Sequence, residues 1–120
     1  MPQNLSKKGL AEPNQLLVVV TSLPGMEAAQ SLGRSLVEER LAACVQLTNG
    51  IQSIYRWEGK VCEELEVLLS VKTTPNQWSA ISNFIQKNHP YDLPEILAFT
   101  PEQYSEQYGE WVNSEVNSQS

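Results

Sequence analysis

Residues 51–73 read IQSIYRWEGKVCEELEVLLSVKT, and this segment sets the architecture of the chain. Over 51–57 apolar and polar side chains alternate with a period of two, which is typical of a β-strand. The tripeptide EGK at 58–60 supplies a turn, and the alternation resumes over 66–73. The sequence therefore predicts one long β-hairpin that occupies residues 44–74.

Two segments before the hairpin predict a strand and a helix. Residues 16–21 read LLVVVT and are apolar on both faces, which is typical of a buried central strand. From residue 26 to about residue 41 the apolar side chains recur at helical spacing, with polar side chains between them. This pattern predicts an amphipathic helix of about four turns.

The segments after the hairpin predict a second helix, a short strand and a third helix. Residues 74–75, Thr-Pro, are typical of a helix start, and Pro90 ends that helix. A short strand is expected over 93–99, and residues 100–102 are expected to begin the third helix. The buried stripe of the second helix is expected to comprise Trp78, Ile81, Phe84 and Ile85.

The element order is strand, helix, strand, strand, helix, strand, followed by an extra C-terminal helix. This βαββαβ order predicts an α+β, ferredoxin-like sandwich in which two helices cover one face of an antiparallel sheet. The expected organisation is a flexible tail over 1–15, a single domain over 16–116 and a polar end over 117–120. The second sheet face is apolar and has no helix of this core, so the C-terminal helix is expected to cover part of it and other subunits the rest.

Composition and charge exclude several classes of protein. The 120 residues carry a net charge of −6 without a basic cluster, which makes nucleic-acid binding unfavourable. No apolar run approaches the roughly 20 residues of a membrane helix, so no membrane partner is expected. The N-terminus has no secretory signal pattern, and two cysteines fit a reducing compartment. The expected location is therefore the cytoplasm.

Five sequence blocks, taken together and in this order, resemble the CutA family of divalent-cation-tolerance proteins. The resemblance runs from about residue 16 to residue 112. Any one block is weak evidence of membership. The five blocks together are strong evidence, because they occur in the order of the family and with nearly the same spacing. The blocks are ERLAACV (39–45), SIYRWEGK (53–60), EVLL with KT (66–69, 72–73), HPY with PEI (89–91, 94–96), and Tyr108 with Trp111.

The resemblance implies a ferredoxin-like protomer in a homotrimer whose architecture is related to PII signalling proteins. It also implies an association with copper and other divalent metal ions. It says little about mechanism. Some family members carry a cysteine near the end of the first strand, where this chain has Val20 or Thr21. A metal site that uses that cysteine is therefore not expected here.

Cys44 and His89 are the candidate metal ligands. A thiolate and an imidazole suit copper or zinc. Two ligands do not close a site, so a third would come from Met26, a carboxylate or another subunit. The competing interpretation is that Cys44 is a small buried residue at a helix–strand junction and that His89 only ends a helix before Pro90.

A second group of residues is expected at a subunit interface or in a cleft between subunits. Glu66 and Lys72 lie within a strand and share a face, so burial by a neighbour would require partners for both charges. Glu66 is expected to meet Arg56 or a residue across the interface. The aromatic members, which would pack the interface or line the cleft, are Tyr55, Trp57, Tyr91, Tyr108 and Trp111.

The leading functional hypothesis is a homotrimeric, cytoplasmic protein that binds or responds to divalent metal, with no organic cofactor. The alternative is a PII-like signalling or scaffold trimer that binds a small anionic ligand or an unidentified protein partner in its clefts. Lys72 and Tyr91 are the natural residues to test the alternative. An enzyme is not expected, because His89 is the only histidine and neither a Gly-x-Ser-x-Gly motif nor a glycine-rich phosphate loop occurs.

Overall fold

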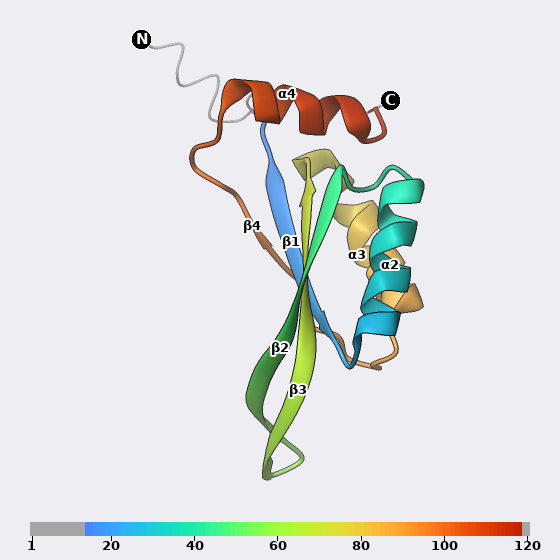
Figure 1. The fold of residues 1–120 in the computed structure, drawn as a ribbon, viewed down its shortest axis with the longest axis vertical. Helices are drawn as coiled ribbons and strands as arrows, with labels where there is room; N and C mark the ends of the chain where they lie inside the picture. The colour runs from blue at the N-terminus through green and yellow to red at the C-terminus, as the bar shows by residue number, and fades with distance from the viewer. Residues whose placement is uncertain (1–13, 119–120) are drawn as a thin grey trace.

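The computed structural model describes residues 14–118 and forms an α+β sandwich (Figure 1). The strand order in the sheet is β2-β3-β1-β4, and every neighbouring pair is antiparallel. This topology confirms the ferredoxin-like prediction, including the long hairpin and the C-terminal helix. The elements are β1 (Leu17–Leu23), α2 (Met26–Glu38), β2 (Cys44–Trp57), β3 (Lys60–Thr73), a 3₁₀ turn (Pro75–Gln77), α3 (Trp78–Asn88), β4 (Leu97–Phe99) and α4 (Glu106–Glu115).

The long hairpin consists of two 14-residue strands that continue well beyond the helices (Figure 1). Trp57 pairs with Lys60, so the loop has two residues, Glu58 and Gly59, and both have positive φ. Positive φ at both loop positions matches the right-handed twist of the strands. A register shift between Thr48 and Ile51 interrupts the β2–β3 ladder.

Helices α2 and α3 cover one face of the sheet, and the core lies between the helices and β1 and β3 (Figure 1). The fully buried side chains of β1 and β3 alternate along each strand, as the period of two requires. On α3, Ile81 and Ile85 are fully buried and Phe84 packs against the core, but Trp78 is 37% exposed. The expected buried stripe is therefore correct except for Trp78, which lies at the first turn of the helix.

Helix α2 ends at Glu38, earlier than the periodicity predicts, because the backbone turns into the left-handed region. Arg40 has φ 60°, the amide of Arg40 donates to the Val37 carbonyl, and the amide of Leu41 donates to the Leu36 carbonyl. These two bonds form a Schellman motif, which satisfies carbonyl groups at the end of a helix. Leu41 remains buried although it lies outside the helix.

Three other boundaries differ from the expectations. Residues 75–77 form a 3₁₀ turn, so α3 begins at Trp78, and Thr74 makes no side-chain cap. Strand β4 is limited to 97–99, because its pairing with β1 runs only from Leu97 to Phe99.

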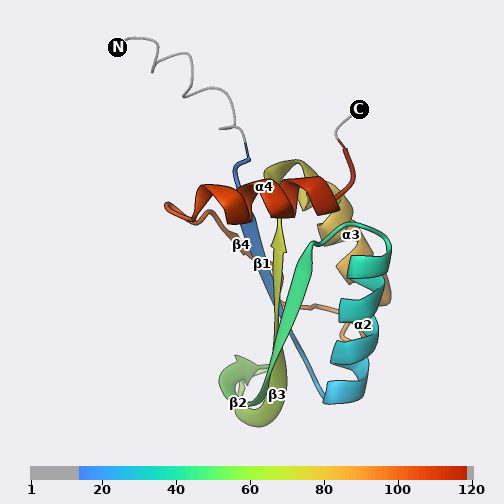
Figure 2. The ribbon, with the colours of Figure 1, turned by 45° about the horizontal axis from the view of Figure 1, so that its top comes forward.

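Helix α4 begins at Glu106, four residues after the expected start at 100–102. The Ser105 hydroxyl accepts a hydrogen bond from the amide of Tyr108 and caps this helix. Tyr104 precedes the helix and packs against Gly109, where a Cβ atom would lie 2.9 Å from the Tyr104 ring. Both views show α4 lying across one end of the sheet (Figures 1 and 2).

The chain segment that follows α4 is tied to the other elements through Asn117. Its amide and its side-chain nitrogen donate to the carbonyl groups of Arg40 and Glu39, and its own carbonyl accepts from Gln77. Residues 1–13 of the expected tail and residues 119–120 of the expected polar end lie outside the described residues. No helix within 14–118 has the length and the apolar character that a membrane crossing requires.

Candidate functional site

Glu66 is a buried carboxylate on the sheet face that helices α2 and α3 leave open. The hydroxyl of Ser53, on β2, donates to Oε1 of Glu66 at 2.6 Å. The phenol of Tyr91, in the loop after α3, donates to Oε2 at 2.8 Å. Within residues 14–118 Glu66 forms no ion pair, and Arg56, the partner suggested from the sequence, lies opposite Val61. Two neutral hydroxyl groups therefore compensate a carboxylate that is only 7% exposed.

His89 is held by both of its ring nitrogens. Helix α3 ends at Asn88, and His89 has the extended backbone that a following proline favours. Its Nδ1 accepts a hydrogen bond from the amide of Tyr91 at 3.0 Å, so the proton lies on Nε2, which faces the Ser22 carbonyl at 2.8 Å. Burial lowers the pKa of His89, and the hydrogen bond to the Ser22 carbonyl and the negative charge of Glu66 oppose this effect only in part. A metal ion could bind His89 only if one of these backbone bonds were released.

Tyr91 connects the buried carboxylate with the histidine. Burial, and secondly the hydrogen bond to Glu66, raise the pKa of the Tyr91 phenol well above its ordinary value. The phenol is therefore neutral and can only donate to the carboxylate at physiological pH. The rings of Tyr91 and His89 lie 5.0 Å apart. We call Ser53, Glu66, His89 and Tyr91 the Glu66 cluster.

A second group of predicted residues gathers near α4. Cys44 lies directly opposite Lys72 in the β2–β3 ladder, and the Lys72 ammonium donates to the Gln46 side-chain carbonyl at 2.7 Å. Burial, and secondly the nearby Cys44, raise the pKa of Tyr108. The Tyr108 and Trp111 rings lie 5.7 Å apart on α4. We call Cys44, Lys72, Tyr108 and Trp111 the Cys44 cluster.

The two clusters are too far apart for one protomer to bring Cys44 and His89 to a shared metal ion. Cys44 pairs with Lys72 of β3. Ser22, whose carbonyl binds His89, pairs with Leu68 of β3, which is four residues from Lys72 along that strand. That offset is about 13 Å along the strand, and β1 and β2 lie on opposite sides of β3. Metal–ligand bonds are about 2.0–2.6 Å long.

The other expected metal ligands do not complete a site in the part of the chain that the structure describes. Met26, a suggested third ligand, is half-buried and packs against the core. Within residues 14–118 no group of three or more His, Cys, Asp or Glu residues is placed to hold a metal ion. A site that uses Cys44 and His89 would therefore need more than one copy of the chain.

The outer part of the hairpin exposes apolar side chains on both faces. The Tyr55 phenol donates to Glu64 at 2.9 Å, and this hydrogen bond raises its pKa. Trp57 is 50% exposed. On the opposite face of the hairpin the exposed apolar side chains are Ile54, Val61 and Leu65.

Sequence reasoning missed three polar residues that organise the clusters: Ser22, Gln46 and Ser53. Strand alternation places Ser53 on the same hairpin face as Tyr55, but only the register of the hairpin places it diagonally beside Glu66. Ser22 acts through its backbone carbonyl, which has no signal in the sequence.

Known proteins of one family are similar to this chain in sequence and in structure. A family model described as CutA1 divalent ion tolerance protein matches residues 17–115. The divalent-cation tolerance protein CutA of Thermus thermophilus is 42% identical over 95 residues, which are 79% of this chain and 92% of that protein. The chloroplastic protein CutA of Arabidopsis thaliana is 40% identical over 98 residues, 82% of this chain, but the chain spans only 54% of its length.

Solved structures give the same result. The Cut A1 structure from Thermus thermophilus has a TM-score of 0.83 and 39% identity, covering 85% of this chain and 99% of that chain. The CutA1 structure from Oryza sativa has a TM-score of 0.85 and 36% identity, covering 88% of this chain and 96% of that chain. The chain therefore belongs to the CutA1 divalent ion tolerance protein family.

Proposed function

We propose that this chain assembles as a homotrimer that binds divalent metal, copper first, with ligands from more than one subunit. The observation that carries the proposal is the separation of the Cys44 and Glu66 clusters within one protomer. Cys44 is a half-buried free thiol on the open side of the sheet, and a thiolate is a ligand that copper and zinc prefer. His89 can bind the metal only when its Nε2 loses the hydrogen bond to the Ser22 carbonyl or its Nδ1 loses the hydrogen bond from the Tyr91 amide.

Exposed apolar surface supports the assembly. The open sheet face exposes Leu97 and Phe99, the hairpin exposes apolar side chains on both faces, and β2 and β4 are the two edges of the sheet. Unpaired edges and apolar patches of this kind favour association. When one edge of a subunit meets the other edge of the next, the contact is heterologous and closes into a ring if the rotation allows it.

We assign the remaining candidate residues to the subunit boundaries of this trimer. The aromatic side chains that would pack there are half-exposed in the single chain, as is typical of aromatic residues at interfaces. Lys72 has no carboxylate within 4.0 Å in residues 14–118, so a neighbour can supply its counter-charge. The boundary residues are Tyr55, Trp57, Glu66, Lys72, Tyr91, Tyr108 and Trp111.

Titration of metal-free, reduced protein with copper against a competing chelator tests the proposal. The particle mass is measured by native mass spectrometry on the same sample. We expect a fixed number of copper ions per trimer and loss of this binding in Cys44→Ala. Cys62→Ala is the matched control, because Cys62 is the other free thiol and lies near the hairpin tip. Equal loss in both variants, or unchanged binding in both, would remove the assigned ligand.

His89→Ala separates a ligand role from a structural role. If His89 binds copper, the variant loses affinity while the trimer mass is retained. If His89 only holds its turn, copper affinity is unchanged and thermal stability falls. The second result leaves Cys44 in the site and removes His89 from it.

A cleft ligand held by Lys72 and Tyr91 is the alternative function. The two residues belong to different clusters, so one protomer does not bring them together, and this alternative also depends on a second copy. We propose a cytoplasmic, non-enzymatic protein, which cell fractionation would test. The plant relative is named chloroplastic and an Archaeoglobus fulgidus structure is titled periplasmic, so family members occur in different compartments.

A further inference from the structure

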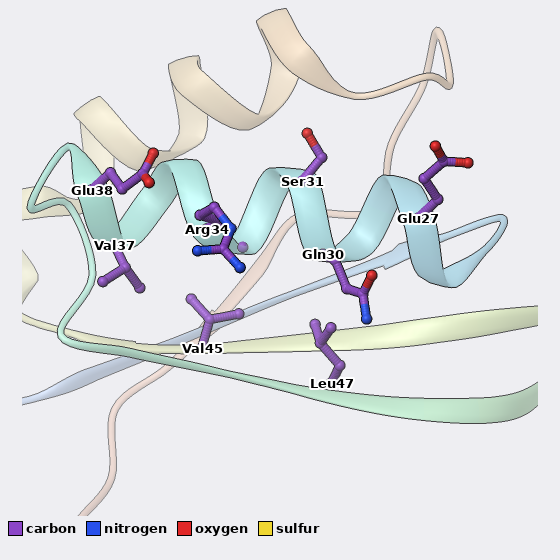
Figure 3. Close-up of a pocket in the computed structure, with 9 residues that line it drawn as sticks. Glu27, Gln30, Ser31, Arg34, Val37, Glu38, Val45 and Leu47 are labelled. Atoms are coloured by element: carbon purple, nitrogen blue, oxygen red, sulfur yellow. The ribbon is translucent and has the colours of Figure 1, made fainter.

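A groove lies between helix α2 and the edge strand β2, on the helix side of the sheet (Figure 3). Its volume is about 640 Å³, which is within the range of small-molecule sites. The groove residues are Glu27, Gln30, Ser31, Gly33, Arg34, Val37, Glu38, Val45 and Leu47.

The position of β2 creates this groove. Strand β2 is at the edge of the sheet, so within one protomer no further strand of residues 14–118 lies beyond it. In the trimer proposed above, the β4 edge of the next subunit would border the open side of the groove, so the groove is tested in the native assembly. Gly33 brings α2 close to β2, because a Cβ atom at this position would lie 3.0 Å from Val45 Cγ1. On either side of this close contact, α2 and β2 are separated by a channel that the side chains of neither element fill.

The side chains that point into the channel combine one cation, one amide and an apolar floor. Gln30, Arg34 and Val37 point from α2 toward the strand, and Val45 and Leu47 point up from β2 (Figure 3). The carboxylates that border the channel, Glu27 and Glu38, and the Ser31 hydroxyl point away from the strand (Figure 3). The charge that faces the channel is therefore the Arg34 guanidinium.

Among the residues that the structure describes, the guanidinium of Arg34 has no partner. It makes neither an ion pair within 4.0 Å nor a side-chain hydrogen bond. A guanidinium binds a carboxylate or a phosphate through two parallel N–H donors. Gln30 lies one turn before Arg34 on the same side of α2, where its amide adds a donor beside the guanidinium.

We propose that this groove binds a small organic anion whose carboxylate or phosphate group is held by Arg34 and Gln30. The apolar part of the ligand lies on Val37, Val45 and Leu47. The site is separate from the proposed copper ligands, because Val45 and Cys44 are consecutive in a strand and point to opposite faces of the sheet. It can therefore be tested without metal.

Amide chemical shifts of the full chain, in its native assembly, are followed while 4-methylpentanoate is added. We expect saturable shifts confined to residues around 30–37 and 45–47, with a dissociation constant of about 1 mM for so small a probe. The neutral 4-methylpentanamide has the same apolar body and is expected to bind at least about tenfold more weakly. Inorganic phosphate, which has the charge without the apolar body, is expected to bind more weakly than the carboxylate.

Arg34→Gln is expected to raise the dissociation constant of 4-methylpentanoate about tenfold. Val37→Ala is expected to raise it a few-fold by removing part of the floor. The matched control is Arg56→Gln, an exposed arginine of the hairpin that forms no ion pair within residues 14–118.

Three results would each overturn the proposal. The first is an absence of saturable shifts up to about 20 mM carboxylate, a concentration well above the expected constant. The second is equal binding of the acid and the amide. The third is an equal loss of affinity in Arg34→Gln and Arg56→Gln, which would indicate attraction by overall charge and not by the groove.

Discussion

The phenol of Tyr91 donates a hydrogen bond to Oε2 of Glu66 at 2.8 Å, across 25 residues of sequence. This bond joins the loop after α3 to the base of the long hairpin. A buried carboxylate without a counter-charge depends on such donors, because water has been removed from it. The Glu66–Tyr91 contact therefore couples the position of His89 to the hairpin that the proposed trimer uses for assembly.

Tyr91→Phe is expected to destabilise the protein by about 1–3 kcal/mol, because it leaves one buried carboxylate oxygen without its donor. Urea denaturation at fixed protein concentration measures the change. Tyr55→Phe is the matched control, since its partner Glu64 is exposed to water, and it is expected to have little effect. Adding Glu66→Gln to Tyr91→Phe should recover part of the loss, because an amide tolerates burial better than a charge. No difference between the two tyrosine variants would contradict this role of Tyr91.

Stability is expected to fall as the pH decreases below about 6.5. Burial lowers the pKa of His89 below its ordinary value of 6.5, so the unfolded chain takes up a proton before the folded chain does. The contribution of His89 is therefore complete above pH 6.5 and is lost as the pH falls through the folded-state pKa. Urea midpoints between pH 8 and pH 5 measure it. His89→Gln should lose the part of the slope that begins just below pH 6.5, and an unchanged slope would exclude His89 as its source.

Thr21→Val is expected to stabilise the protein by about 1 kcal/mol. The Thr21 hydroxyl is fully buried, and among residues 14–118 it has no hydrogen-bond partner, so removing it removes a desolvated polar atom without changing the shape. Thr73→Val is the matched control. The Thr73 hydroxyl donates to the Leu41 carbonyl at 2.7 Å, and its loss should destabilise by about 1 kcal/mol. Destabilisation by Thr21→Val of the size seen in Thr73→Val would show that the Thr21 hydroxyl has a partner.

Gly33→Ala is expected to destabilise the protein by about 1 kcal/mol, because the new methyl group would lie 3.0 Å from Val45 Cγ1, and the strain of this contact exceeds the roughly 1 kcal/mol that alanine gains over glycine inside a helix. The double variant Gly33→Ala/Val45→Ala should recover part of this loss, and a thermodynamic cycle measures the coupling. Additive effects of the two substitutions would show that the helix moves without strain.

Thermal unfolding is expected to shift to higher temperature as the protein concentration increases, because assembly stabilises the folded chain by mass action. Leu65→Glu places a charge on a hairpin side chain that is 69% exposed in the single chain, and it should weaken both the assembly and the concentration dependence. Ser79→Glu adds the same charge on the exposed side of α3 and should leave both unchanged. A monomer-sized particle with a concentration-independent melting temperature would contradict the trimer.

Local patterns in the sequence are sufficient to predict the hairpin, the central strand and two helices. Alternation over 51–57 and 66–73 requires strands, and the dipeptide Glu58–Gly59 accepts the positive φ of a two-residue turn. The blocks that resemble the CutA family predict the same fold. These signals are reliable because each depends on neighbouring residues only.

The helix boundaries depend on contacts that the sequence pattern does not contain. Helix α4 begins at Glu106 because Ser105 caps it and Tyr104 packs over Gly109. Helix α2 ends at Glu38 because Arg40 adopts a left-handed conformation, although periodicity continues to Leu41. In both cases packing and backbone geometry override the helical periodicity.

The sequence by itself determined the strands of the sheet, the residue types available for metal and interface chemistry, and the family of the chain. Only the tertiary structure decided which of those residues meet. It separated Cys44 from His89, gave Glu66 the hydroxyl groups of Ser53 and Tyr91, and turned the polar side of α2 around Arg34 into one wall of a groove. The physical reason is that strand order and register set distances between residues far apart in the chain, whereas a sequence pattern reports only the face on which each residue lies.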